Sequence, residues 1–232
     1  MSMNALLVVQ ARTGSTRLPG KVLADLGGRP MLRFLLDRLD GLDRTVIDEV
    51  VVATSTETRD DAVAEIAAAA GRPVVRGSEQ DVLARFIAAL DAYPAHNVVR
   101  ITADCPLTDP ALVEAVVEHH VERGAHYTTN TLPRTFPKGL DVEVATAEAL
   151  RVAHAEAATR PEREHVMPFL YRRPERFRLA NLRNDSPLGS ERWTVDTAED
   201  LARVRAMCAR LGTENSFGWR DLLDVLPPGT SG

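Results

Sequence analysis

The residues best suited to chemistry lie in one loop at the start of the chain, where Val8 to Lys21 reads VVQARTGSTRLPGK. An apolar run ends there in small residues, and Gly14 and Ser15 let the backbone turn sharply with N–H groups free to face an anion. Arg12 can fork onto two phosphate oxygens, whereas Lys21 acts as a point charge. We therefore predict an exposed phosphate-binding loop. The alternative is a solvated surface loop whose cations only keep the protein soluble.

The spacing within this loop excludes two common nucleotide motifs. It is not GxxxxGK[ST], because Val22 follows Lys21, and it is not GxGxxG. Neither a P-loop ATPase nor a dinucleotide-binding fold is therefore predicted. A third cation, Arg17, keeps the loop basic, so the phosphate interpretation stands without either motif.

Two acidic residues follow short apolar segments far apart in the chain. Asp104 lies just beyond the predicted strand Val98–Thr102, and Asp196 follows a predicted strand at Trp193–Val195. In open parallel sheets the carboxyl ends of strands face the ligand site, so the two acids are expected to meet there. Two carboxylates with substrate phosphates suit magnesium. The alternative for Asp104 is a simple turn before Pro106.

The elements that must position these residues alternate between strand and helix patterns, which is the sign of a mainly parallel sheet wrapped by helices. The predicted strands of the first half are Leu6–Val9, Glu49–Ala53, Pro73–Val75 and Val98–Thr102, and the predicted helices are Met31–Leu39, Asp60–Ala70 and Asp81–Leu90. After Gly124 the pattern changes to a small β excursion, with strands at His126–Asn130, Leu140–Val144 and Phe177–Leu182. Helices are predicted at Ala198–Leu211 and Trp219–Val225.

Length and composition agree with one enzyme domain. The 232 residues can bury one core, and we expect a single domain over 1–226 with a disordered tail at 227–232. A net charge of -5 argues against a nucleic-acid partner. Cys105 and Cys208 are interpreted as reduced thiols of a cytoplasmic protein. No stretch approaches the roughly 20 apolar residues of a membrane helix, so no membrane contact is expected.

Several segments in a fixed order carry a family resemblance. They are Gln10–Arg12 with Gly14–Lys21, Arg76–Glu79 with Asp81–Arg85, Asp104–Leu107, Lys138–Glu143, Arg163–Val166 and Trp193–Thr197. Together they resemble the cytidylyltransferase family that includes the CMP-KDO and CMP-sialic acid synthetases, most closely its spore coat polysaccharide biosynthesis protein F-like branch. Each match is weak alone, but the ordered set spans nearly the whole chain.

The resemblance implies a Rossmann-like nucleotide-diphospho-sugar transferase fold of the GT-A-like type. It also implies transfer of CMP from CTP to a small acidic sugar, a nonulosonic or 3-deoxy sugar acid, with release of pyrophosphate for surface polysaccharide or glycoconjugate biosynthesis. A homodimer is expected. The enzyme would contribute mainly positioning and charge neutralisation, with no covalent intermediate. Magnesium would be bound by Asp104 and Asp196.

Roles for individual residues follow from the same resemblance. Arg12, Lys21 and Asp104 are the predicted catalytic residues, and the predicted nucleotide-binding residues are Ala11, Gly14, Ser15, Arg17, Arg76, Gly77 and Ser78. The loop at Gly77 would approach the base. Ser78 fits equally well as the N-cap of the next helix, and Arg85 in that helix could be only a surface charge.

The acceptor would contact four residues, Asp141, Glu143, Arg163 and His165. Alternation along a strand puts Asp141 and Glu143 on one face, where they could equally be two exposed polar residues. Arg163 offers a planar fork for a carboxylate, and His165 lies among charged residues, where it could be only a solvated helix residue.

Two other functions remain open. One is a sugar-phosphate nucleotidyltransferase that uses another nucleoside triphosphate. The other is a non-catalytic nucleotide-binding module of glycan assembly. The presence of Lys21, Asp104 and Asp196 favours an active enzyme over the second.

Overall fold

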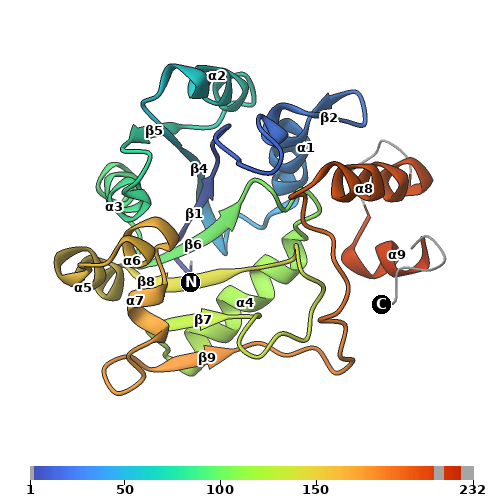
Figure 1. The fold of residues 1–232 in the computed structure, drawn as a ribbon. Helices are drawn as coiled ribbons and strands as arrows, with labels where there is room; N and C mark the ends of the chain where they lie inside the picture. Colours follow the sequence, from blue (N-terminus) through green and yellow to red (C-terminus); the bar gives the residue numbers. More distant parts are fainter. Residues whose placement is uncertain (1–2, 212–216, 226–232) are drawn as a thin grey trace.

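The computed structural model describes residues 3–211 and 217–225, and its centre is a seven-stranded sheet in the order β5-β4-β1-β6-β8-β7-β9 (Figure 1). The strands are β1 (Ala5–Gln10), β4 (Ile47–Ser55), β5 (Val74–Gly77), β6 (Asn97–Thr102), β7 (Tyr127–Thr129), β8 (Glu143–Thr146) and β9 (Leu179–Asn181). Two short strands, β2 (Asp25–Leu26) and β3 (Arg29–Pro30), pair separately. The first four strands along the sheet are parallel, and β8 joins β6 in the antiparallel sense.

Helices cover both faces of the sheet. One core contains residues of α1 (Met31–Arg38), α2 (Asp61–Ala69), α4 (Pro110–Arg123), α8 (Ala198–Leu211) and α9 (Trp219–Asp224). The other face carries α3 (Val82–Ala92), α5 (Ala147–Glu156), α6 (Arg160–His165) and α7 (Pro168–Tyr171). Short 3₁₀ turns lie at η1 (Lys21–Leu23), η2 (Leu39–Gly41) and η3 (Thr58–Asp60).

Strand β1 shows why the first segment of the chain is apolar throughout. Its alternate residues Leu7 and Val9 belong to one core, and Leu6 and Val8 belong to the other. A strand covered on both faces needs apolar side chains at consecutive positions, which is the pattern of a parallel sheet.

The connections create a crevice at one edge of the sheet. From β1 the chain moves outward to β4 and β5, then returns to place β6 on the other side of β1. Gln10 and Thr102 end these two strands in register. Where strand order reverses in this way, the crevice outside the carboxyl ends of the strands is open to a ligand.

The mainly parallel sheet with helices on both faces confirms the predicted architecture, and the strands expected after Gly124 extend the same sheet. The strand predicted at Trp193–Val195 is wrong, because the segment pairs with loops: Trp193 N donates to Lys138 O, and Val195 N donates to Asp104 O. The tail predicted at 227–232 lies outside the described residues. In the part of the chain that the structure describes, no helix has the length and apolar character needed to cross a membrane.

Candidate functional site

A polar cavity of about 370 Å³ lies at the carboxyl ends of β1 and β6, and we call it cavity 1. Its walls come from the loop after β1, from the end of β6 and from the end of α6. The lining residues are Gln10, Arg12, Gly14, Ser15, Thr16, Arg17, Lys21, Val22, Arg100, Thr102, Ala103, Asp104, Glu164 and His165. The structure therefore brings most of the predicted phosphate loop, one predicted carboxylate and His165 to a single cavity.

Asp60, which the sequence analysis did not identify, holds the loop after β1 in place through hydrogen bonds from Thr13. Asp60 accepts hydrogen bonds from Thr13 N at 2.7 Å and Thr13 Oγ1 at 2.6 Å, and a third from Ser55 Oγ. Burial opposes its ionisation, but the hydrogen bonds from Ser55 and Thr13 outweigh burial and lower the pKa of Asp60. An aspartate before a helix resembles an ordinary cap, so nothing in the sequence separates this role from capping.

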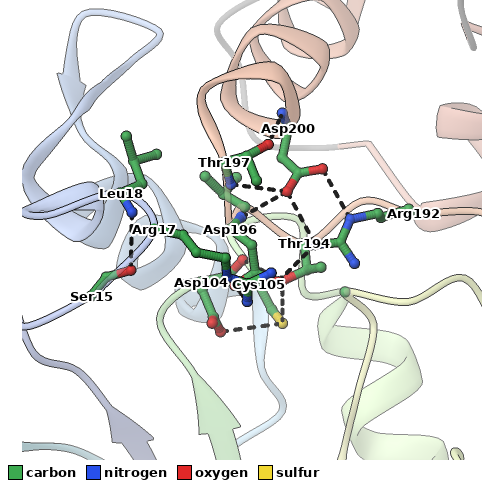
Figure 2. Close-up of polar contacts among 12 residues, drawn as sticks. Ser15, Arg17, Leu18, Asp104, Cys105, Arg192, Thr194, Asp196, Thr197 and Asp200 are labelled. Carbon is green, nitrogen blue, oxygen red and sulfur yellow. Dashed lines mark hydrogen bonds and ion pairs between the residues drawn. The ribbon is translucent and has the colours of Figure 1, made fainter.

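The upper part of the loop leaves backbone donors available. Ser15 N donates to Thr13 O at 2.8 Å, and Ser15 Oγ accepts from Leu18 N at 3.4 Å (Figure 2). Within the described residues, the N–H groups of Gly14, Thr16 and Arg17 have no hydrogen-bond partner. Successive free N–H groups beside cationic side chains form an anion-binding concavity. This arrangement is what a phosphate-binding loop requires.

Lys21 occupies the centre of the site, and the expectation that it lies in an exposed loop is wrong. Only 8% of the residue is accessible, because Gly20 adopts φ +70° and turns the chain so that Lys21 points inward. Its Nζ donates to Asp104 Oδ2 at 2.9 Å, to Asp196 Oδ1 at 3.0 Å and to Val195 O at 2.7 Å. The two acids predicted to meet at the sheet edge do meet, and they meet on this ammonium.

Asp196 carries more positive partners than Lys21 alone. Arg17 contacts its Oδ1 at 3.0 Å, and Arg192 donates to its Oδ2 at 2.7 Å (Figure 2). Burial opposes ionisation, but Lys21, Arg192 and Arg17 outweigh it, so the pKa of Asp196 is lowered. Asp196 is therefore an anion at neutral pH.

Asp200 holds the turn that carries Asp196. It accepts from the backbone N–H groups of Asp196 at 2.9 Å and Thr197 at 3.0 Å, and from Arg192 Nε at 3.0 Å (Figure 2). Burial opposes its charge, yet these hydrogen bonds prevail and lower the pKa of Asp200 to about 2. The turn after Val195 is thus fixed by charge and backbone contacts together.

The predicted magnesium site can be compared with these contacts. Asp104 and Asp196 each turn one oxygen to Lys21 Nζ, so a hard cation that also takes phosphate oxygens would bind beside the ammonium, through a carboxylate oxygen that the ammonium leaves available. Asp104 Oδ1 is the less engaged oxygen, since its contact is Cys105 Sγ at 3.7 Å. No group of three or more His, Cys, Asp or Glu side chains in the described residues is placed to hold a metal. The donor set fits a metal that is completed by substrate.

A second cavity, cavity 2, adjoins the first and has a volume of about 260 Å³. It shares Arg100, Thr102 and Asp104 with cavity 1, and its other lining residues are Cys105, Thr131, Lys138, Asp141, Glu143, Thr194 and Asp196. Asp141 and Glu143 therefore face one space, as their spacing predicted.

Each of these two carboxylates is neutralised by its own arginine. Arg134 grips Asp141 with both guanidinium nitrogens, with Nη2 at 2.7 Å from Oδ2. Arg100 Nη1 donates to Glu143, which also accepts from Tyr127 Oη at 2.7 Å. Burial and the neighbouring Glu143 raise the pKa of Tyr127, so this phenol remains a donor. Cavity 2 thus presents oriented polar groups without a large excess of negative charge.

Arg100 is a cavity residue that the sequence reasoning missed. It lines both cavities, and its Nε and Nη2 donate to Gln10 Oε1 at 3.1 and 3.0 Å. A signal was available, because Arg100 is the single cation inside the apolar run Val98–Thr102.

Several predicted site residues line neither cavity. Arg76 donates from Nε to Ser55 O at 2.9 Å and pairs with Asp61 at 2.7 Å, so its guanidinium supports the loop after β4. Arg163 donates to Ala157 O at 2.9 Å and lies 3.5 Å from Asp81. The expectation that Arg163 offers its fork to a ligand in these cavities does not agree with this geometry.

The remaining base-loop residues have local roles in this structure. Ser78 does not cap α3, because Asp81 does so by accepting from Ala84 N at 3.0 Å, while Ser78 Oγ accepts from Gln80 N and Asp81 N at 3.2 Å. Gly77 has space for no side chain, since a Cβ there would lie 2.9 Å from Arg85 Cγ.

Ala11 and His165 differ in solvent exposure. Ala11 is buried, and its N–H donates to Ala53 O at 3.1 Å. His165 is exposed at the rim of cavity 1, just before Val166, which adopts φ +70° and ψ −58°. Met167 N donates across this residue to His165 O at 2.8 Å, which makes a strained γ-turn. Val166 is fully buried, so packing in the core holds this strained turn at the end of α6.

The fold and the site together define a class of protein. A basic loop at a strand switch point, facing two carboxylates and opening into a second polar cavity, is the arrangement of a nucleotidyltransferase. A family model described as cytidylyltransferase matches residues 6–207. The chain belongs to the cytidylyltransferase family and is a nucleotidyltransferase.

Individual relatives agree with this assignment. The chain is 31% identical over 226 residues to the spore coat polysaccharide biosynthesis protein SpsF of Bacillus subtilis, covering 95% of this chain and 93% of that protein. It is 32% identical to the 3-deoxy-manno-octulosonate cytidylyltransferase of Rhodospirillum centenum, covering 88% and 93%. A solved cytidylyltransferase from Leptospira borgpetersenii aligns with a TM-score of 0.90 at 33% identity, over 96% of this chain and 93% of that one.

Proposed function

We propose that the protein transfers CMP from CTP to a small acidic sugar and releases pyrophosphate. The observation that carries this proposal is Lys21, which lies between Asp104 and Asp196 where cavities 1 and 2 meet. A reacting phosphate there would have the basic loop on one side and the acceptor space on the other. The names of SpsF and of the 3-deoxy-manno-octulosonate cytidylyltransferases support a sugar acceptor and a place in polysaccharide biosynthesis.

In this proposal the triphosphate lies in cavity 1. The free N–H groups of Gly14, Thr16 and Arg17 and the side chains of Arg12 and Lys21 bind its oxygens. Arg12 is paired with Glu164 at 3.3 Å in this structure, so its guanidinium must exchange a carboxylate for a phosphate when the nucleotide binds.

The acceptor hydroxyl attacks the α-phosphorus, the bond from this phosphorus to the bridging oxygen of pyrophosphate breaks, and the hydroxyl proton goes to solvent. Asp104 and Asp196 would hold Mg²⁺, which supplies neutralisation of the developing charge. The protein residues orient the acceptor and the triphosphate for in-line attack, which is the main contribution expected in phosphoryl chemistry.

An acidic acceptor fits cavity 2 because its carboxylates are already paired. Asp141 is held by Arg134 and Glu143 by Arg100, so both can accept hydrogen bonds from sugar hydroxyls. Lys138 is exposed, lines the same cavity and has no ion-pair partner in the described part of the chain. We assign the acceptor carboxylate to Lys138, in place of Arg163.

The test is pyrophosphate release measured with CTP, UTP, GTP and ATP against a panel of acidic and neutral sugars in the presence of Mg²⁺. We expect turnover with CTP and a 3-deoxy or nonulosonic sugar acid. Faster turnover with a neutral sugar 1-phosphate and UTP or GTP would contradict both the donor and the acceptor proposed.

A further inference from the structure

Gln10 ends strand β1 with half of its side-chain amide in use. The residues before it in the strand are apolar and buried, whereas Gln10 is partly accessible and lines cavity 1. Its Oε1 accepts hydrogen bonds from Arg100 Nε at 3.1 Å and from Arg100 Nη2 at 3.0 Å. Among the described residues its Nε2 has no partner, and this nitrogen is not one of the buried polar atoms left without one. The amide nitrogen is therefore accessible, on a residue of the cavity wall.

Arg100 fixes the direction in which this amide faces. A guanidinium has donors and no acceptor, so the amide must turn its oxygen toward Arg100, because a flipped amide would set N–H groups against N–H groups. Arg100 is in turn held on its other side, where its Nη1 donates to Glu143. The two N–H bonds of Gln10 Nε2 thus point away from Arg100 and keep that direction before any ligand arrives. Donors oriented in advance are those that stabilise charge most effectively during a reaction.

Asn130 shows what a structural amide looks like in this fold. It is 1% accessible, its Nδ2 donates to Leu140 O at 2.7 Å, and its Oδ1 accepts from Val142 N at 3.0 Å. Both ends of that amide hold backbone segments together. In Gln10 the oxygen alone has a partner, so holding Arg100 in place accounts for one end of the side chain and leaves the donor end without a structural role.

The surroundings of Gln10 indicate the ligand that its donors would meet. Cavity 1 also presents Arg12, Arg17 and Lys21, so an anion is the ligand favoured there. Arg100 lines both cavities, and its contact with Gln10 places the amide toward their junction. The free backbone N–H groups lie farther along the loop and are left for the outer phosphates of a triphosphate. The phosphate nearest the junction is the one that an acceptor in cavity 2 would attack.

We propose that Gln10 is a catalytic residue that donates from Nε2 to a non-bridging oxygen of the α-phosphate. This inference rests on the proposed function, because it requires a nucleoside triphosphate in cavity 1 and an acceptor in cavity 2. Gln10 forms no covalent bond and transfers no proton. Its hydrogen bond strengthens as charge shifts onto the phosphate oxygen during the attack. A neutral donor adds this stabilisation without a second cation beside Arg100, which acts through Gln10 as a positioning residue.

The first experiment compares kcat and KM of wild-type protein, Gln10→Glu and Gln10→Met, with CTP and the acidic sugar that the wild type uses fastest. A glutamate still accepts hydrogen bonds from Arg100 but offers no donor, whereas a methionine offers neither. We expect kcat to fall about a hundredfold in both variants. Near-normal kcat in Gln10→Glu would overturn the inference, because Gln10 would then only hold Arg100 in place.

The second experiment identifies the contacted oxygen. CTP is prepared with sulfur in place of one or the other non-bridging oxygen of the α-phosphate, because sulfur accepts hydrogen bonds more weakly than oxygen. In the wild type, sulfur at the contacted oxygen should slow the transfer. In Gln10→Met this penalty should shrink about tenfold for that diastereomer and stay unchanged for the other, since the contact is already lost. Unchanged penalties for both diastereomers would overturn the inference.

Asn130→Asp is the control for the loss of a structural amide. It should unfold at a lower urea concentration than the wild type, because Leu140 O loses its donor, and its folded protein should keep the wild-type sulfur penalties. A penalty that shrinks in Asn130→Asp as much as in Gln10→Met would overturn the inference. Wild-type protein that prefers another nucleoside triphosphate would contradict the proposed donor alone, and the sulfur comparison would then use that nucleotide. Wild-type protein that transfers no nucleotide would overturn both proposals.

Discussion

Where the two cavities meet, a single ammonium serves two carboxylates, whereas the other two carboxylates of cavity 2 each have an arginine of their own. Lys21 is shared by Asp104 and Asp196, but Asp141 and Glu143 are paired one to one with Arg134 and Arg100. Because Lys21 contacts both carboxylates, it can give up one of these contacts when a metal or a phosphate enters and still keep the other. Exclusive pairs resist such exchange and keep their oxygens oriented. The difference suits chemistry where the cavities meet and recognition in the rest of cavity 2.

The largest effect is expected from removing the shared cation. Lys21→Met should lower kcat/KM for CTP about a thousandfold, because the ammonium would no longer stabilise charge at the reacting phosphate. It should also lower the free energy of unfolding by roughly 3 kcal/mol, since two carboxylates would lose a common partner in a largely buried place. Steady-state kinetics and urea unfolding check both. Near-normal turnover of Lys21→Met would show that Lys21 takes no part in the reaction.

A smaller loss of activity is expected from Asp104→Asn. The carboxamide keeps the shape but removes the anion, so kcat should fall about a hundredfold and the Mg²⁺ concentration for half-maximal activity should rise. Asp109→Asn is the matched comparison. Asp109 caps α4 by accepting from Leu112 N at 3.0 Å and also accepts from Trp219 N at 2.6 Å. This variant should lose stability and keep its Mg²⁺ dependence; equal Mg²⁺ dependence in wild type and Asp104→Asn would contradict the metal assignment.

The exclusive pairs of cavity 2 should separate the two substrates. Asp141 lines cavity 2 and not cavity 1, so Asp141→Asn, which leaves Arg134 without this partner, should raise the acceptor KM about tenfold and leave the KM for CTP within about twofold. Glu143→Gln releases Arg100, which lines both cavities, so it should change both KM values. Initial rates over a matrix of both substrate concentrations make this comparison. The same pattern from both variants would mean that the pairs are not independent.

The smallest effect concerns stability at low pH. The pKa of Asp200 is about 2 in the fold against an ordinary value of 3.8, so its contribution is complete above about pH 4 and is lost as pH falls toward 2. Asp200→Asn should therefore be about 2 kcal/mol less stable than wild type at pH 7. This difference should shrink between pH 4 and pH 2, as measured by urea unfolding at each pH. If the stability difference between wild type and Asp200→Asn stays constant from pH 4 to pH 2, ionisation of Asp200 is not its source.

The sequence was enough to predict the sheet and to predict that the basic loop, Asp104 and Asp196 lie close together. Alternating apolar runs determine strand and helix identity locally, and a glycine-rich loop with cations after a first strand is typical of anion binding. The meeting of Asp104 with Asp196 was also predicted, but only half of the reason holds: Asp104 follows β6, whereas Asp196 follows a loop whose backbone pairs with Asp104.

The partners of the charged residues were not predictable. Arg76 and Arg85 lie nine positions apart; the first was expected at the base, and the second could have been only a surface charge. In the structure Arg76 binds backbone carbonyls and Asp61, and Arg85 is buried. Burial depends on which face of α3 meets the sheet and on the space left by Gly77, which are tertiary facts. The role of Asp60 was not predicted for the same reason, since its hydrogen-bond partner Thr13 is 47 positions away in the sequence.

Arg100 gives the two cavities a common wall, which has a consequence for the order and strength of substrate binding. One guanidinium contacts Gln10 on one side and Glu143 on the other, so a ligand that shifts it in either space changes the other space. With the nucleotide in cavity 1 and the acceptor in cavity 2, as proposed, this contact would link their two affinities. By reciprocity, whatever factor the nucleotide applies to acceptor binding, the acceptor must apply to nucleotide binding. A single side chain is thus placed to link nucleotide binding with acceptor binding within one subunit.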